Sequence, residues 1–248
     1  MRRRFFVDRF DSQSASLLGE TADHLGRVLR AAPGQLYELS DGQHVWLGRI
    51  ERVVTAKRGE SRIDFSLVQP IEQRLDPLVV QLYLSVVKFD RFEWCLEKAT
   101  ELGVSTIVPL ASARSDKALI AAAEKRRERW QRILVESAQQ ARRLQAPVLG
   151  AIAGSEAAFA ACDAARGILL SELPGAPPLR DILTSATSAE SIAFAVGPEG
   201  GWTEDEIAIA RKAQFVEASL SNHILRTETA VIAALAIIRL GFGGRADP

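Results

Sequence analysis

Hydrophobic and polar positions follow two different rhythms along this 248-residue chain. In the first part, short alternating runs predict four strands, at residues 4–7, 35–39, 45–54 and 62–68. Asp41-Gly42 predicts a turn between two of them, and one helical pattern covers residues 22–30. These features are typical of a small β-barrel. Residues 71–77 lack periodicity and lie between prolines, so they predict a linker.

From Leu78 onward, apolar strands alternate with helices. The predicted strands cover residues 78–87, 106–110, 148–152, 168–170, 192–196 and 215–220. A last helix runs from Glu228 to about Leu240. This alternation predicts an α/β domain with a mainly parallel sheet over residues 78–248, after a barrel over residues 1–70. Ligands of such sheets bind at the carboxyl ends of the strands, so the loops after residues 170, 196 and 220 are the expected sites of chemistry.

The loop after residue 196 reads VGPEGGWTEDE. Thr203 and Glu206 have the spacing of a capping box, so a helix should begin at Thr203. Gly197, Gly200 and Gly201 then form the turn between strand and helix, where a ligand can approach the backbone closely. A purely structural turn is the alternative interpretation.

This loop does not fit the known phosphate-binding motifs. It lacks the lysine of a P-loop and the glycine spacing of a dinucleotide site, and Glu199 would repel a phosphate. A neutral or cationic ligand that bonds to backbone groups fits better. Adenosine carrying a sulfonium is one such molecule.

The other two loops also carry polar side chains just beyond a strand. In LSNHILRTETA, residues 220–230, Thr227 is the expected cap of the last helix, with Glu228 in the first turn. Glu228 could simply complement the helix dipole. Arg226 follows two apolar residues, which should hold its guanidinium near the loop. In SELPG, Glu172 again follows a strand end.

A basic helix is predicted from about Lys125 to Leu144. Its buried stripe should consist of Trp130, Ile133, Leu134, Ala138, Ala141 and Leu144. A polar row at helical spacing contains Arg129, Arg132, Glu136, Gln140 and Arg143. Ion pairing on an exposed helix is the alternative explanation of this row.

Composition narrows the class of protein. The formal net charge is zero, but residues 112–145 hold nine Lys and Arg against four Asp and Glu, a basic region that could attract a polyanion. Cys95 and Cys162 lie inside helical patterns, which argues against disulfides and a metal site and for a reducing compartment. No signal peptide fits the start, and the apolar run 230–238 is too short to cross a bilayer. We therefore expect a cytoplasmic protein with no membrane or metal partner.

Several stretches resemble the RsmE family, SPOUT-superfamily methyltransferases that modify N3 of a uridine in bacterial 16S ribosomal RNA. The similar stretches are GPEGGWTEDE, HILRTETA, ESAQQARRLQAP and KATELGV, together with RRFFV and residues 24–30 near the start. The resemblance spans most of the chain. It implies an α/β fold with an amino-terminal PUA-like RNA-binding β-barrel and a carboxyl-terminal SPOUT domain containing a trefoil knot. It also implies a homodimer that binds S-adenosyl-L-methionine in the knot and acts on 16S rRNA or the small ribosomal subunit.

The resemblance assigns roles residue by residue. The implied cofactor-binding residues are Glu172, Leu173, Gly197, Pro198, Glu199, Gly200, Gly201, Leu220, Ile224, Leu225, Thr227, Glu228 and Ala230. Gln140 and Arg143 match a helix motif expected to face RNA and the partner's active site. We expect Arg2, Arg3, Arg4, Arg27 and Arg30 to contact phosphates.

The expected chemistry assigns catalytic roles to Arg143, Arg226 and Glu199. Either guanidinium could favour the N3 anion of uridine, while Glu199, Glu228 and bulk hydroxide are candidates for the base. The chain departs from the family pattern at Ser221, which could narrow the adenine pocket, and at Gln139, where an amide replaces an acid.

Other functions stay open at this point. They are a knotted methyltransferase acting on another base or on a ribose hydroxyl, an RNA-binding assembly factor without catalysis and, more distantly, a nicotinamide-dependent oxidoreductase.

Overall fold

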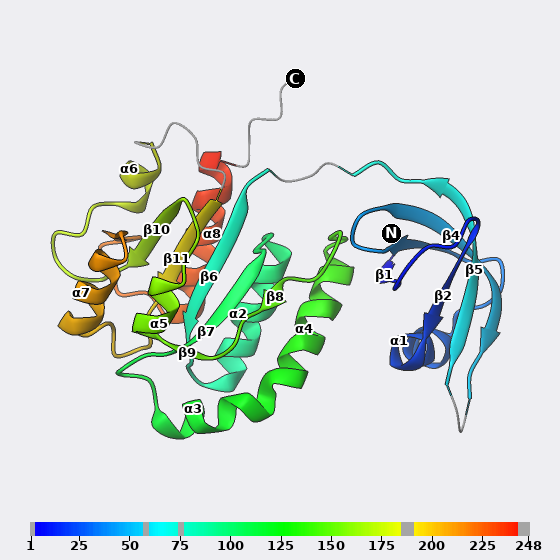
Figure 1. Ribbon diagram of the computed structural model, residues 1–248, viewed down its shortest axis with the longest axis horizontal. Helices are drawn as coiled ribbons and strands as arrows, with labels where there is room; N and C mark the ends of the chain where they lie inside the picture. The colour runs from blue at the N-terminus through cyan, green and yellow to red at the C-terminus, as the bar shows by residue number, and fades with distance from the viewer. Residues whose placement is uncertain (1–2, 57–59, 74–76, 185–190, 243–248) are drawn as a thin grey trace. The chain divides into compact units, whose positions relative to one another are not determined.

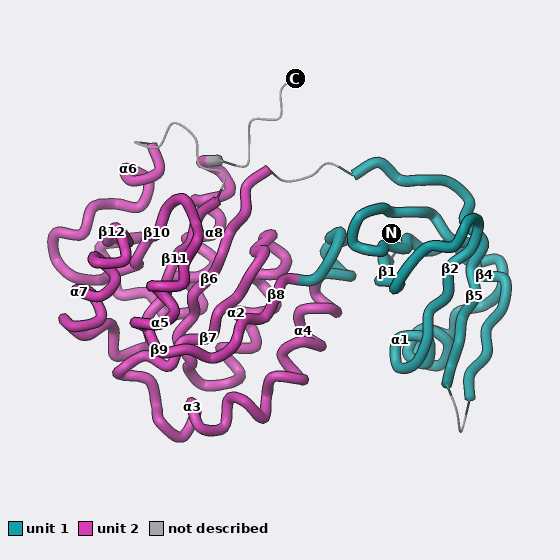
Figure 2. Tube along the Cα trace, in the orientation of Figure 1, with its two compact units in different colours: residues 1–75, 138–146 teal, residues 76–137, 147–248 magenta. Residues whose placement is uncertain are grey.

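The computed structural model describes residues 3–56, 60–73, 77–184 and 191–242 (Figure 1). Arg2 and residues 74–76 of the predicted linker lie outside the described residues. The chain divides into two compact units, shown in Figure 2. Unit 1 comprises residues 1–75 and 138–146, and unit 2 comprises residues 76–137 and 147–248. The grouping of residues 138–146 with unit 1 is a feature that the sequence pattern did not indicate.

Unit 1 contains a five-stranded half-barrel sheet in the order β1-β3-β4-β5-β2. Its strands are β1 (Arg4–Phe6), β2 (Ser14–Leu18), β3 (Leu36–Ser40), β4 (Val45–Val54) and β5 (Arg62–Pro70). The predicted helix at residues 22–30 is a short α-helix, α1 (Gly19–Asp23), continued by a π-helical turn, η1 (His24–Val28). Strand β2 was not predicted. Its sequence SASLL has weak strand propensity, and its pairing with β5 is a contact distant in sequence.

Unit 2 is built on a parallel sheet in the order β12-β10-β11-β6-β7-β8, with β9 paired to β7. Its strands are β6 (Val79–Ser85), β7 (Thr106–Ala111), β8 (Val148–Leu149), β9 (Ala153–Gly154), β10 (Arg166–Leu170), β11 (Ser191–Val196) and β12 (Phe215–Ala218). The predicted strand 148–152 is wrong: only β8, residues 148–149, falls within it, and β9 follows directly after residue 152. Both short strands pair with β7. The mainly parallel α/β sheet is confirmed.

The helices of unit 2 cover both faces of the sheet (Figure 1). They are α2 (Phe89–Glu101), α3 (Lys117–Ala123), the 3-10 turn η2 (Glu124–Arg126), α4 (Arg127–Gln140), α5 (Ser155–Ala160), α6 (Leu179–Thr184), α7 (Glu204–Lys212) and α8 (Thr227–Phe242). The last residues of α4, 138–140, are grouped with unit 1. Within the described residues, none of these helices has the length and apolar character to span a membrane.

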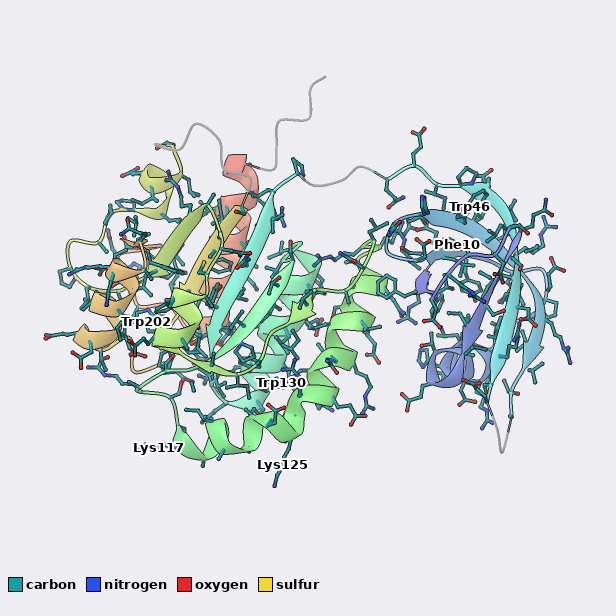
Figure 3. The ribbon with its side chains drawn as sticks, in the orientation of Figure 1. Phe10, Trp46, Lys117, Lys125, Trp130 and Trp202 are labelled. Carbon is teal, nitrogen blue, oxygen red and sulfur yellow. The ribbon has the colours of Figure 1, made fainter. Side chains whose placement is uncertain are left out.

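Alternation along the strands creates two cores in unit 2. In β11, Ile192, Phe194 and Val196 join the core shared with α2, α4 and α8. Ala193 and Ala195 join the other core, with α5 and α7. Trp130 of α4, labelled in Figure 3, is fully buried against Phe92, with 4.5 Å between the ring centroids. Both faces of the sheet are therefore packed, which holds the strand ends in place.

Helix α4 ends earlier than predicted. It stops at Gln140, and Arg142 has a left-handed backbone with φ of 55°. The amide of Arg143 donates to the carbonyl of Ala138 over 2.9 Å, which closes the helix end. The prediction of a helix through Leu144 is wrong, and Arg143 does not continue the row formed by Glu136 and Gln140.

Candidate functional site

Three loops of unit 2 meet at the carboxyl ends of neighbouring strands. β12, β10 and β11 are adjacent and parallel, and the loops that follow them line one cavity of about 280 Å³. The loop after β10 contributes residues 171–173, the loop after β11 contributes residues 197–199, 201 and 202, and the loop after β12 contributes residues 220, 221 and 223–227. These are the three loops in which the sequence predicted chemistry.

Most of the predicted cofactor residues line this cavity. They are Glu172, Leu173, Gly197, Pro198, Glu199, Gly201, Leu220, Ile224, Leu225, Thr227 and Ala230. Gly200 and Glu228 do not. One carboxylate oxygen of Glu228, Oε2, is buried and has no hydrogen-bond partner among the described residues. Burial, together with the nearby charge of Glu228, raises the pKa of the Cys95 thiol in α2 to about 12.

The loop after β11 needs its glycines. The amide of Gly201 donates to the carbonyl of Pro198 over 2.8 Å, and Gly201 has a φ of 69°, which favours glycine. A Cβ on Gly201 would lie 3.0 Å from Oε1 of Glu172, and a Cβ on Gly197 would lie 3.1 Å from the Trp202 ring. Backbone conformation therefore favours glycine at residue 201, and a Cβ at residue 197 would press against the Trp202 ring.

Trp202 joins two of the loops. It is buried, and its Nε1 donates to the carbonyl of Leu170 at the end of β10 over 2.9 Å. Figure 3 labels this side chain beside the sheet of unit 2. The bond fixes the GPEGG loop, residues 197–201, relative to the strand beside it.

The predicted capping box is confirmed at the start of α7. The amide of Glu206 donates to Oγ1 of Thr203 over 3.2 Å, and the amide of Thr203 donates back to the carboxylate over 3.0 Å. Glu206 also accepts bonds from the amide of Ala113 and the hydroxyl of Ser155, at 2.9 and 2.8 Å. Burial alone would raise the pKa of Glu206, but these hydrogen bonds outweigh it and lower the pKa below its usual value.

Arg114 is a cavity residue that the sequence analysis missed. It follows β7, and its Nη1 donates to the carbonyls of Gly200 and Trp202 over 2.8 and 3.2 Å. The partners are distant in sequence, so no local pattern linked them. One signal was available: Arg114 comes three residues after the carboxyl end of β7, where the rule for parallel sheets also applies.

The predicted catalytic residues fall in different units. Glu199 and Arg226 line the cavity of unit 2, whereas Arg143 belongs to unit 1. Glu199 forms an ion pair with Arg91 of α2 at 3.0 Å, which ties the GPEGG loop to that helix. Arg226 is exposed, and its carbonyl accepts the amide of Ala230 in the first turn of α8.

The predicted phosphate-binding arginines differ in exposure. Arg27 and Arg30 are exposed, as is Gln140, and Arg3 is half-buried. Arg4 is only 3% exposed, pairs with Glu38 at 2.9 Å and donates to the carbonyl of Arg142 over 2.6 Å. A buried and fully engaged guanidinium does not fit a phosphate contact, so the prediction for Arg4 is corrected: it holds residues 138–146 within unit 1.

Comparison with known proteins places the chain in the class of RNA methyltransferases. The family described as RNA methyltransferase domain matches residues 74–239, which cover the cavity and its three loops. A ribosomal RNA small subunit methyltransferase E from Synechocystis is 33% identical over 87% of this chain and 69% of its own. One from Aquifex aeolicus is 31% identical over 77% of this chain and 81% of its own.

Structural comparison agrees with the sequence relatives. A crystal structure of ribosomal RNA small subunit methyltransferase E from Neisseria gonorrhoeae, bound to S-adenosyl methionine, is similar with a TM-score of 0.85. It is 31% identical and covers 99% of this chain and 100% of that one. The chain belongs to the ribosomal RNA small subunit methyltransferase E family, RsmE.

Proposed function

We propose that this protein transfers the methyl group of S-adenosyl-L-methionine to N3 of a uridine in 16S ribosomal RNA. The observation that carries the proposal is the cavity of bare backbone at three adjacent strand ends, within the region that matches the RNA methyltransferase family. The Neisseria relative bound to S-adenosyl methionine supports the choice of methyl donor.

The residues of the cavity fit this donor. Gly197 and Gly201 leave main chain open where a Cβ would meet Trp202 or Glu172, so a flat adenosyl group could lie against backbone amides and carbonyls. Leu170, Leu220 and Leu225 supply apolar walls for the base. Glu172 and Glu199 add negative charge that favours a sulfonium. When bound, the donor supplies an electrophilic methyl group.

The protein's own contribution to the chemistry is positioning and charge. Methyl transfer to uridine N3 would leave S-adenosylhomocysteine as the second product, and the N3 proton would pass to a base. Arg226, which lines the cavity, would stabilise the N3 anion, and Arg143 would do so from a partner chain. Glu199 or bulk hydroxide would take the proton. Glu228 is a weaker candidate because it does not line the cavity and one of its carboxylate oxygens is buried. Correct alignment of the reactants can contribute effective molarities of about 10⁵ to 10⁸ M.

The finer architecture is also a proposal. We infer that the half-barrel of unit 1 is a PUA-like RNA-binding domain, that residues 71–77 link it to the rest, and that residues 78–248 form a SPOUT domain with a trefoil knot. A homodimer would let Gln140 and Arg143 of one chain serve the partner's cavity. Arg3, Arg27 and Arg30, with Arg2, would contact RNA phosphates. The proposed substrate implies a cytoplasmic location.

Nucleoside analysis of ribosomal RNA tests this function. Deletion of the gene should remove N3-methyluridine from digested 16S rRNA, and the purified protein with the methyl donor should restore it. Loss of a different methylated base or of a ribose methyl group would contradict the proposed target. A normal nucleoside profile would contradict the activity on rRNA altogether.

A further inference from the structure

Two opposite charges lie at one edge of the cavity without pairing. Oε1 of Glu172 approaches to 3.0 Å of the point where a Cβ on Gly201 would lie, and Nη1 of Arg114 approaches to 4.0 Å of the same point. Both side chains line the cavity, and both are exposed. Among the described residues, Arg114 bonds to the carbonyls of Gly200 and Trp202 and not to Glu172. A carboxylate and a guanidinium thus flank the same bare segment of backbone.

Arg114 is held in place but keeps unused donors. Its Nη1 is fixed by the carbonyls of Gly200 and Trp202, and its aliphatic part packs on Gly200, where a Cβ would lie 3.2 Å from the Arg114 Cβ. Its Nε and Nη2 groups make no hydrogen bond to any of the described residues. A guanidinium with a fixed orientation and free N–H groups is suited to binding a carboxylate.

From this geometry we infer that Arg114 and Glu172 recognise the amino-acid end of the methyl donor, with Arg114 binding its α-carboxylate and Glu172 its α-ammonium. The inference rests on the proposed function, because it adds to the adenosyl site a second subsite for a zwitterion. A Cβ at residue 201 would lie 3.0 Å from Oε1 of Glu172, so a glycine there leaves the observed position of this carboxylate open. The subsite would distinguish the complete donor from nucleosides that lack the amino acid.

Two ligands separate binding of the amino-acid end from positioning of the loop. S-adenosylhomocysteine carries the complete amino acid, whereas 5′-methylthioadenosine lacks it and keeps the adenosyl part. In calorimetric titrations, Arg114→Met should weaken S-adenosylhomocysteine about tenfold and leave 5′-methylthioadenosine within about twofold. Arg180→Met, which removes an exposed arginine that does not line the cavity, should change neither affinity.

Glu172→Gln tests the other charge. Because Glu172 is exposed, its loss should weaken S-adenosylhomocysteine by only about threefold. Glu172→Gln should bind an analogue of S-adenosylhomocysteine that lacks the α-amino group and keeps the α-carboxylate as tightly as the unmodified protein does.

Three results would overturn the inference. An equal loss of both ligands in Arg114→Met would mean that Arg114 only positions the GPEGG loop. Unchanged binding of S-adenosylhomocysteine would mean that the guanidinium does not touch the donor. If the unmodified protein bound neither ligand, the proposed methyl donor itself would be wrong, which is a failure distinct from the other two.

Discussion

At the residue scale, Gly201 is the position where backbone conformation and ligand access coincide. Its φ of 69° costs an alanine about 1–2 kcal/mol, and the added Cβ would lie 3.0 Å from Glu172 Oε1. We predict that Gly201→Ala lowers the thermal unfolding midpoint and weakens S-adenosylhomocysteine more than tenfold. Gly154→Ala is the matched control, since nothing lies within 4 Å of a Cβ there and its φ is −66°. If Gly201→Ala and Gly154→Ala changed the unfolding midpoint and the affinity for S-adenosylhomocysteine equally, bare backbone at residue 201 would not be needed for binding.

Arg143 gives a second prediction at this scale. It lies in unit 1, outside the cavity-forming unit, and its proposed role is to act on the RNA. Arg143→Ala should lower methylation of 16S rRNA strongly while donor affinity stays within about twofold, a change below about 0.5 kcal/mol. Turnover and calorimetry on the same preparation would measure both. A parallel fall of turnover and donor affinity would remove Arg143 from this role.

At the element scale, Glu206 fixes the start of α7 behind the GPEGG loop. Its pKa is lowered on folding, because hydrogen bonds to the charged form outweigh burial. Its stabilising effect is therefore complete above the usual glutamate pKa and is lost as the pH falls through the lower pKa of the folded state. Glu206→Gln should lower the free energy of unfolding by about 1–2 kcal/mol near pH 7. In acid, the difference in unfolding free energy between the variant and the unmodified protein should be smaller.

Denaturant unfolding from pH 7 down to acid would measure this dependence. Glu204→Gln, an exposed residue of the same first turn, should shift stability only slightly at every pH. A Glu206→Gln deficit that stays constant as the pH falls would mean that the charge of Glu206 is not what stabilises α7.

The same elements explain what the sequence could predict. The capping box of Thr203 and Glu206 and the mainly parallel sheet of unit 2 follow from patterns of residues close in sequence, and these predictions were confirmed, except that the predicted strand 148–152 was wrong. Strand β2, the ion pair of Arg4 with Glu38 and the bonds of Arg114 join residues far apart in sequence. The end of α4 is local, but Arg142 in a left-handed conformation replaces the usual glycine signal, so periodicity alone extended the helix.

At the scale of the whole molecule, a net charge of zero coexists with exposed arginines on unit 1. If Arg27 and Arg30 contact phosphates, replacing both with alanine should lower rRNA affinity and reduce the slope of log affinity against log salt by about 1 to 2. Binding assays over a salt series would measure the slope. Arg180→Ala serves as the control on unit 2, and an unchanged slope in the double variant would exclude these phosphate contacts.

The central claim for the molecule is that backbone at the ends of β10, β11 and β12 holds the adenosyl part of the methyl donor. A crystal structure of the protein with S-adenosylhomocysteine tests it most directly. We expect the adenosyl group inside the cavity, bonded to main-chain atoms of the GPEGG loop and of residues 220–227. An adenosyl group bound elsewhere, or a cavity filled by the protein's own side chains in that crystal, would contradict it.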